Sequence, residues 1–140
     1  MSGAFLEDLE VGQSAALTRT VAASDLETFA AVTGDDNPLH LDEAYAATTP
    51  FKGRIAHGML SAGYISAVLG TKLPGPGAVY VSQSLSFRRP VRIGDEVTAT
   101  AEVAAIDLAK GRVTLSTDCR VAGKVVVEGE AVAIVPRRPA

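Results

Sequence analysis

Apolar residues recur with two different periods along this chain, one in its N-terminal half and one in its C-terminal half. Residues 14–22 are compatible with a strand, and apolar residues then recur at helical spacing, which predicts a helix that begins at Ser24. Ser24 and Glu27 have the spacing of a capping box, and Gly34 is the residue type that commonly ends a helix. The first third of the chain therefore predicts one strand and one short helix.

A second and longer helix is predicted near the middle of the chain. Residues 34–56 contain two prolines and two glycines and are expected to be irregular, apart from one helical turn over 42–47. From His57 to Leu69, apolar residues occupy almost every side of a helix, so we expect this helix to be buried. The Pro-Gly-Pro-Gly run at 74–77 closes it.

Beyond residue 78 the apolar period changes to two, which is typical of strands. Ala122-Gly123 is predicted to be a two-residue hairpin turn. Helices followed by antiparallel strands indicate an α+β domain, and because no linker or repeat divides the chain, residues 1–140 are expected to form one domain. The predicted strands are 79–87, 97–106, 112–121 and 124–135.

Charge and composition argue against several classes of function. The formal net charge of the 140 residues is −3, so a basic face for nucleic acid is not expected. No apolar run reaches the ~20 residues of a membrane-spanning helix, and we recognise no signal peptide, so we expect no membrane association. Cys119 is the only cysteine and cannot form an internal disulfide, which favours a cytoplasmic location.

Three short blocks of sequence carry a resemblance to a known family. Residues 34–40 read Gly-Asp-Asp-Asn-Pro-Leu-His and resemble the hydratase-2 signature of the MaoC-like dehydratases: Asp, one free residue, Asn, Pro, an aliphatic residue and His. Asp36 occupies the free position and is expected to point away. Residues 56–60, Ala-His-Gly-Met-Leu, and residues 84–97, with Arg-Arg-Pro-Val and Gly-Asp-Glu-Val, resemble two later blocks of the family.

The resemblance extends over residues 10–135 and is greatest to single-domain (R)-specific enoyl-CoA hydratases that supply polyhydroxyalkanoate synthesis. It implies the hot-dog fold, in which a curved antiparallel sheet wraps around a central helix, and a homodimer. It also implies reversible hydration of trans-2-enoyl-CoA to (R)-3-hydroxyacyl-CoA. It further implies that no metal or organic cofactor is needed; coenzyme A enters as part of the substrate.

Asp35 and His40 are the acid–base pair that the resemblance implies. Hydration of an α,β-unsaturated thioester needs a base for the attacking water, a proton for Cα and a donor for the thioester oxygen. We expect burial in an apolar pocket to strengthen Asp35 as a base. We assign abstraction of the water proton to Asp35, and orientation of the water and relay of a proton to Cα to His40. The reverse assignment stays open, because such a pair titrates as a unit.

Four further residues are candidates for supporting this chemistry. The resemblance implies that Gly58 is the oxyanion donor, since N–H groups in the first turn of a helix lack intrahelical partners; close packing is the alternative reason for a glycine here. Asn37 is expected to hold the loop through hydrogen bonds to the backbone. Ser66 is expected to hold His40 or the water, unless it is a packed helix serine, and His57 to be structural at the junction of loop and helix.

Other chemistries fit the sequence less well. His40 and His57 lack the i, i+4 spacing of a helical metal site and no cysteine pair exists, so no metal is expected. A hot-dog acyl-CoA thioesterase typically lacks the Asn-Pro-aliphatic-His run, and a non-catalytic acyl-thioester-binding module is expected to lack one member of the acid–base pair. A dehydratase of acyl-carrier-protein substrates is a further alternative. Arg88, Arg89 and Lys52 are candidates for binding the phosphates of coenzyme A, or are simply solvated charges.

Overall fold

A single curved antiparallel sheet forms the main body of the molecule. The computed structural model describes residues 3–140, so Met1 and Ser2, at which the expected single domain begins, lie outside the described residues. Five strands follow the order β1-β4-β5-β6-β2, and β3 pairs with β6. The strands are β1 (Ser14–Thr20), β2 (Val79–Gln83), β3 (Ser86–Phe87), β4 (Glu96–Asp107), β5 (Arg112–Val121) and β6 (Lys124–Ile134), and a 3₁₀ turn at Leu6–Asp8 precedes them.

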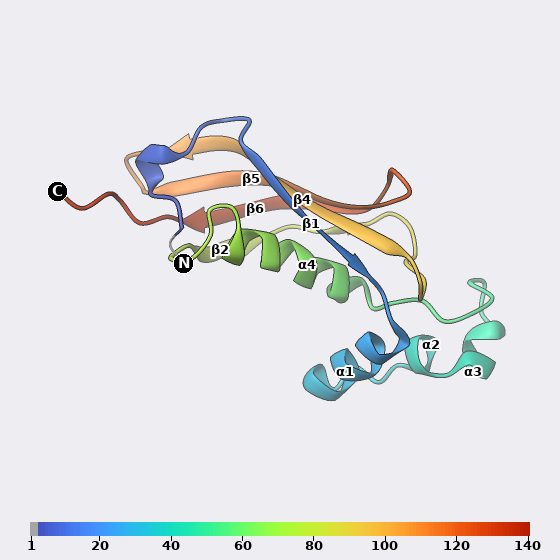
Figure 1. Ribbon diagram of the computed structural model, residues 1–140. Coiled ribbons are helices and arrows are strands. Elements are labelled where there is room, and N and C mark those ends of the chain that lie inside the picture. The colour runs from blue at the N-terminus through green and yellow to red at the C-terminus, as the bar shows by residue number, and fades with distance from the viewer. Residues whose placement is uncertain (1–2) are drawn as a thin grey trace.

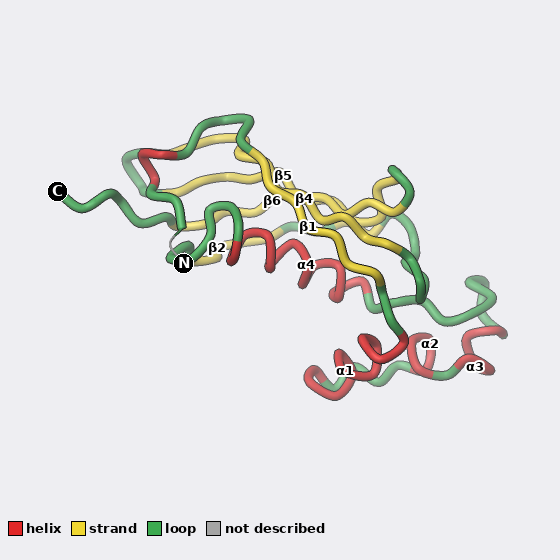
Figure 2. The backbone as a smooth tube through the Cα atoms, viewed as in Figure 1, coloured by secondary structure: helices red, strands yellow, loops and turns green. Residues whose placement is uncertain are grey.

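Helix α4 (Gly58–Thr71) lies along one face of the sheet, and three shorter helices gather beyond one end of it (Figure 1). These are α1 (Ala23–Thr33), α2 (Pro38–Leu41) and α3 (Glu43–Ala47). They are joined to one another by short loops and lie at the end of the molecule opposite to the two chain termini (Figure 2). A curved antiparallel sheet with a central helix is the hot-dog fold, so the expected α+β fold class is confirmed.

The space between α4 and the sheet is filled by small and medium apolar side chains. Along β4, buried residues alternate with more exposed ones, as the two-residue period predicts. Two of the four buried residues of β4 are alanines, which occupy little volume between the sheet and the helix. This packing fixes α4 on the sheet and thereby fixes the position of its first turn. The buried residues involved include Ile65, Val68 and Leu69 of α4 and Val97, Ala99, Ala101 and Val103 of β4.

Three elements differ from those that the sequence predicted. The first helix begins at Ala23, because the Asp25 carboxylate accepts a hydrogen bond from the Ala22 N–H at 2.8 Å and replaces the predicted Ser24 cap. The predicted strand over 79–87 divides into β2 and β3. The proline in the signature segment opens the helical turn α2, where irregular chain was expected.

Helix α4 is buried on one side only in the single chain, so the prediction that this apolar helix is buried was correct for that side alone. The side that meets the sheet contains Ser61 and Ile65 and is buried. Met59, Gly63 and Ser66 are exposed in the single chain. An apolar helix with one uncovered face is typical of a helix that another surface covers.

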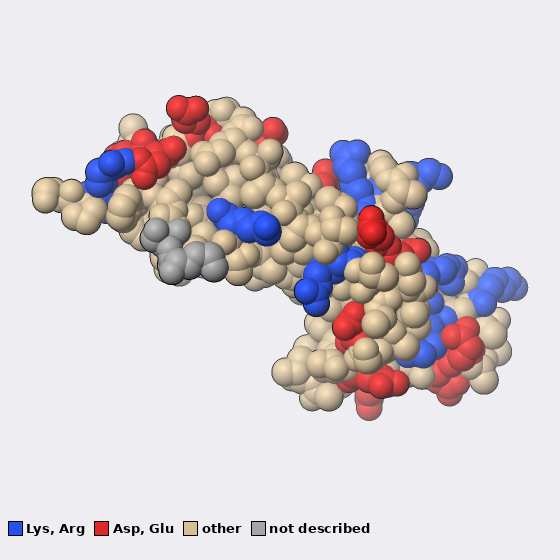
Figure 3. All heavy atoms as spheres, in the orientation of Figure 1, with Lys and Arg blue, Asp and Glu red and all other residues tan. Residues whose placement is uncertain are grey.

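Charged residues of both signs are mixed on the face of the molecule seen in Figure 3. Basic and acidic side chains lie close together at the end formed by α1, α2 and α3, and few lie over the centre of the molecule. This mixture is unlike the basic stripe that a phosphate backbone requires, and it agrees with the net charge of −3. Within residues 3–140, no helix combines the length and the apolar character needed to cross a membrane.

Candidate active site

The loop between α1 and α2 carries the two predicted acid–base residues. Gly34 ends α1 with a φ of 82°, a left-handed conformation that glycine adopts without strain. The Asn37 side chain caps α2, because its oxygen accepts a hydrogen bond from the Leu39 N–H at 3.0 Å, and a proline occupies the first helical position. Asp35 therefore lies on the loop, His40 lies on the helical turn, and Asn37 makes the backbone hydrogen bond expected of it.

His40 is held firmly at its ring and at its backbone. Only 9% of the residue is exposed, and its Nδ1 lies 2.7 Å from the carbonyl oxygen of Ile55. Because a carbonyl oxygen can only accept, Nδ1 carries the hydrogen, and Nε2 of the neutral ring has a free lone pair. Arg54 donates from Nε to the His40 carbonyl at 2.7 Å. The free nitrogen of His40 is therefore presented as a hydrogen-bond acceptor.

His57 joins the predicted pair in one cluster. Its ring is stacked on that of His40, with centroids 4.0 Å apart and planes inclined by 30°. Its Nε2 lies 2.9 Å from the Asp35 carbonyl oxygen, to which it donates for the same reason. One carboxylate oxygen or ring nitrogen from each of Asp35, His40 and His57 lies within 4.8 Å of the others. The structure thus brings together Asp35 and His40 as predicted.

The geometry of this cluster does not suit a metal ion, although two histidines and a carboxylate are common ligands. The lone pair of an imidazole nitrogen lies in the plane of its ring. In two stacked rings these lone pairs run nearly side by side and do not converge on one point, and the rings of His40 and His57 are stacked.

Beside the cluster, a cavity of about 490 Å³ opens at the start of α4. His40, His57, Gly58 and Ser61 are among the residues that line it. Gly58 is the first residue of α4, so its N–H lies in the first turn, where no intrahelical partner is available and the helix dipole is positive. The volume falls in the range of small-molecule sites, and the N–H suits a developing negative charge on oxygen.

Close packing also explains why residue 58 is a glycine, so both readings of this position have support. A Cβ atom at residue 58 would lie 2.6 Å from Cε1 of Phe87, which also lines the cavity. Sequence reasoning did not single out Phe87. The sequence feature that could have identified it is the Ser-Phe-Arg-Arg-Pro block, which resembles a block of the family. Phe87 was passed over because its side chain has no reactive group.

Asp35 is exposed in the single chain, so its expected burial in an apolar pocket was wrong for this state. Its carboxylate has one weak contact, with the Asn37 N–H at 3.5 Å. Asp36 is also exposed, and among the described residues its side chain has no recorded hydrogen bond. The spacing that selected Asp35 over Asp36 is therefore consistent with the cluster around His40.

Ser66 does not line the cavity with His40 and is exposed in the single chain, so neither the expected contact with His40 nor the alternative of a packed helix serine is found. It lies in a second, open groove of about 520 Å³, together with Phe29 and Tyr80. Ser61, one of the buried residues of α4, lines the His40 cavity instead and is 1% exposed. Met59 lines both hollows and therefore lies between them.

Cys119 lies under the start of α4 as a packed strand residue. It is fully buried, and its Sγ donates to the Ser61 carbonyl at 3.4 Å. Burial raises the pKa of the Cys119 thiol to about 12, with a smaller contribution from the charge of Asp118. A neutral thiol of this kind is a poor nucleophile, so Cys119 has no place in the chemistry of the cavity.

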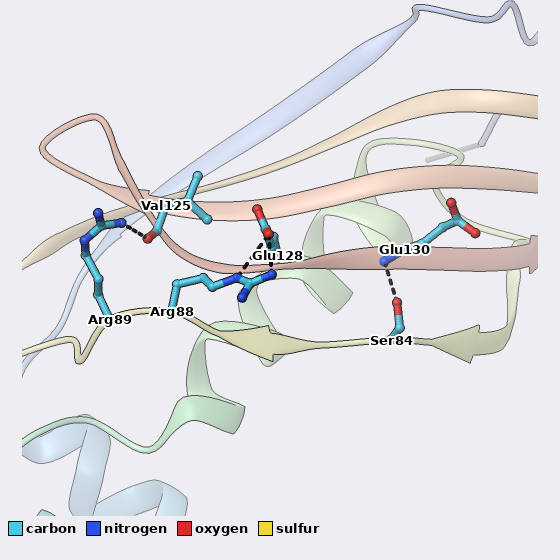
Figure 4. Close-up of polar contacts among 6 residues, drawn as sticks. All are labelled: Ser84, Arg88, Arg89, Val125, Glu128 and Glu130. Atoms are coloured by element: carbon cyan, nitrogen blue, oxygen red, sulfur yellow. Dashed lines mark hydrogen bonds and ion pairs between the residues drawn. The ribbon is translucent and has the colours of Figure 1, made fainter.

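Two arginines, Arg88 and Arg89, also line the cavity. Arg88 donates from Nε and Nη2 to the Glu128 carboxylate at 3.1 and 2.9 Å, and Arg89 donates from Nη1 to the Val125 carbonyl at 2.7 Å (Figure 4). The Ser84 hydroxyl accepts from the N–H of Glu130 at 2.9 Å on the same pair of segments. These contacts fasten the segment that contains β3 to β6, so the cavity wall is carried by the sheet.

Comparisons with known proteins point to one family. Residues 7–125 match the family model described as the MaoC like domain. The (R)-specific enoyl-CoA hydratase of Rhodospirillum rubrum is 60% identical over 134 residues, which are 96% of this chain and 93% of that protein.

Two solved structures are similar over nearly the whole fold. The unliganded R-hydratase PhaJ1 of Pseudomonas aeruginosa has a TM-score of 0.91 and 52% identity, and the match covers 97% of this chain and 88% of that one. The (R)-hydratase of A. caviae involved in PHA biosynthesis has a TM-score of 0.90 and 50% identity, covering 93% of this chain and 99% of that one. This chain belongs to the MaoC-like domain family.

Proposed function

We propose that this protein is an (R)-specific enoyl-CoA hydratase, a hydro-lyase that reversibly converts trans-2-enoyl-CoA to (R)-3-hydroxyacyl-CoA. The observation that carries the proposal is that the Asp35 carboxylate and the His40 ring belong to one cluster, while His40 and Gly58 line one cavity. The R. rubrum relative has that activity in its name, at 60% identity.

The two acceptors suit a single water molecule. A water between them donates one hydrogen to the Asp35 carboxylate and the other to Nε2 of His40. As the water oxygen bonds to Cβ, one proton passes to the pair and electrons move from the double bond to the thioester oxygen. The Gly58 N–H stabilises that oxygen, and the pair then returns one proton to Cα. One whole water is added, and no metal or organic cofactor takes part in these steps.

The substrate is proposed to extend across the boundary between the two hollows. The coenzyme A portion extends out of the cavity on the side of Arg88 and Arg89, whose positive charges suit its phosphates. The acyl chain runs past Met59 into the groove that contains Ser66. Small acyl chains reach only the start of this groove, so chain-length preference depends on its lining.

We also propose that the protein is a homodimer. Strand β2 lies at one end of the strand order, and its Val79, Tyr80 and Val81 are 59%, 39% and 42% exposed. An apolar edge strand of this kind favours pairing with a second chain. A partner on this edge would also approach the uncovered face of α4 and the groove beside Ser66. For the location we propose the cytoplasm, supported by the single reduced and buried Cys119.

Two other functions are less well supported. A hot-dog thioesterase does not require the paired acceptors, and a non-catalytic binding module does not require either of them. A dehydratase of acyl-carrier-protein substrates would use the same groups, and it differs in how the carrier is bound. As with the A. caviae protein, supply of polyhydroxyalkanoate synthesis is the physiological role that we propose.

Hydration of crotonyl-CoA tests the proposal directly. We expect the enoyl absorbance to fall on addition of the protein and the product to be (R)-3-hydroxybutyryl-CoA on chiral analysis. An (S) product, or no turnover with enoyl-CoA substrates of several lengths, contradicts the proposal. Release of free coenzyme A without hydration favours the thioesterase. Comparison of crotonyl-CoA with the matching acyl-carrier-protein thioester distinguishes the two carriers.

A further inference from the structure

The loop that carries Asp35 is held almost entirely by local contacts. The Asp35 N–H donates to Oγ1 of Thr33 at 3.1 Å, and the Asp36 N–H donates to the Gly34 carbonyl at 3.0 Å. Each of these bonds joins residues that are two positions apart. Such bonds shape a turn, but they do not fix its place relative to the rest of the protein.

Within the described residues, one hydrogen bond alone joins residues 34–37 to a residue distant in sequence. It runs from Nε2 of His57 to the Asp35 carbonyl oxygen, over 2.9 Å and 22 positions of the chain. The acceptor belongs to the same residue as the catalytic carboxylate. The position of that carboxylate relative to the cavity therefore depends on His57.

The ring of His57 is itself buried and packed against two other rings. Only 2% of the residue is exposed. Phe29 of α1 packs at a centroid distance of 4.5 Å, and His40 of α2 is stacked at 4.0 Å. His57 precedes α4 directly, but its side chain makes no capping bond to that helix. The ring therefore forms its hydrogen bond with the loop that carries Asp35 and not with helix α4.

The second nitrogen of His57 shows that packing alone does not account for the residue. Its Nδ1 is buried without a hydrogen-bond partner among the described residues. Leaving a buried polar atom unpaired is unfavourable, and an apolar ring would fill the same space between Phe29 and His40 without that penalty. The histidine is therefore explained by the atom that is paired, Nε2, and hence by its contact with Asp35.

We propose that His57 is a positioning residue whose Nε2–H, bonded to the Asp35 carbonyl, sets the distance between the Asp35 carboxylate and the oxyanion donor at Gly58. This link is short because His57 and Gly58 are consecutive. The His57 side chain holds the Asp35 carbonyl, and the backbone N–H of the next residue, Gly58, is the oxyanion donor. His57 does not touch the reacting atoms and transfers no proton. This inference rests on the proposed hydratase function.

A matched pair of variants tests the link. In His57→Gln, the side-chain amide reaches about as far as Nε2 of histidine, whereas in His57→Asn it is one methylene shorter. Both variants place an amide in the same buried site. We expect His57→Gln to keep kcat for crotonyl-CoA within about tenfold of the unmodified protein and His57→Asn to lower it by about 100-fold, because a small misplacement of a catalytic group has effects of that size. KM should change little in either variant, since the lost positioning acts in the transition state.

The same pair in an Asp35→Ala background separates positioning from a general effect on folding. If His57 acts through Asp35, His57→Gln and His57→Asn should have equal residual activity once the carboxylate is gone. Equal losses for the two variants in the unmodified background, or a persistent 100-fold difference in the Asp35→Ala background, would overturn the inference. A failure of the unmodified protein to hydrate crotonyl-CoA would instead overturn the proposed function, so the two failures are distinguishable.

A measurement on the unmodified protein covers the case in which a variant does not fold. Long-range ¹H–¹⁵N correlation spectra report which ring nitrogen of a histidine carries the hydrogen. We expect Nε2 of the His57 ring to carry a hydrogen, because it faces the Asp35 carbonyl oxygen. Observation of the Nδ1–H tautomer would exclude the bond to the Asp35 carbonyl and overturn the inference without any substitution.

Discussion

Replacement of Gly58 by alanine separates the two reasons for a glycine at the start of α4. The N–H of residue 58 is retained in Gly58→Ala, so a pure oxyanion role leaves activity unchanged. The added Cβ, however, would lie 2.6 Å from Cε1 and 2.7 Å from Cδ1 of Phe87. Carbon atoms in contact are ~3.5–4.0 Å apart, so the ring or the helix start must move by roughly 1 Å.

The loss of stability and activity in Gly58→Ala depends on whether the Phe87 ring or the start of α4 moves. Overpacking of this kind costs about 1–3 kcal/mol in a closed core. Phe87 is 53% exposed, so its ring can turn outward and the loss of stability should lie near the lower limit, about 1 kcal/mol. Movement at the cavity wall has a larger effect on catalysis, and we expect kcat/KM for crotonyl-CoA to fall by ~10- to 100-fold.

Phe87→Ala supplies the control for this prediction. With the ring removed, the added methyl group has room, so Gly58→Ala made in the Phe87→Ala protein should change kcat/KM by less than about twofold. Steady-state hydration assays and urea unfolding of all four proteins give both quantities. An equal loss in the two backgrounds would refute the steric reasoning, and full activity of Gly58→Ala alone would show that the contact is not restrictive.

Three further outcomes are expected. Asp35→Asn and His40→Gln should each lower kcat by at least ~100-fold in a protein that unfolds normally in urea. Near-normal turnover by Asp35→Asn would show that the Asp35 carboxylate has no part in the mechanism. Val81→Lys, on the apolar edge strand, should convert a dimer into a monomer in light scattering, whereas an unchanged mass would exclude this edge. The buried Cys119 thiol, with its pKa raised to about 12, stays neutral in the fold while the unfolded thiol ionises above pH ~8.5. Relative to Cys119→Ala, the protein should therefore lose up to ~1.4 kcal/mol of unfolding free energy per pH unit above that value, and a constant difference between pH 8 and 10 would contradict this.

The parts of the fold that could be predicted are those in which a local pattern is strong. The strand over 112–121 was predicted with its observed bounds, because apolar and polar residues alternate along it. The turn at Ala122-Gly123 also agrees, since both residues adopt a positive φ, of 51° and 78°. The turn α2 was missed because one helical turn is too short to show a period. Its proline was interpreted as a breaker, although proline is common in the first position of a helix.

The candidate site was only partly predictable, because its geometry depends on how α4 is rotated on the sheet. Ser61 and Ser66 are five residues apart, which on a helix of 3.6 residues per turn corresponds to a rotation of about 140°. They therefore face different hollows, and only the packing of Ile65 and its neighbours decides which serine lines the cavity with His40. The contact between His57 and the Asp35 carbonyl was unpredictable for a related reason. The acceptor is a backbone atom, and a sequence motif does not show it.

The arrangement of α1, α2 and α3 beyond the end of the sheet has a consequence for how the protein would lose function (Figure 1). Only two residues of α1, Leu26 and Ala30, are buried, whereas the sheet and α4 contribute most of the core. Segments with few buried contacts open locally at lower free energy than the core. Asp35 and His40 belong to this part of the chain, so enzymatic activity requires the α1–α3 segment to be folded onto the rest of the protein. Under mild denaturation, activity would then be lost while the sheet is still intact.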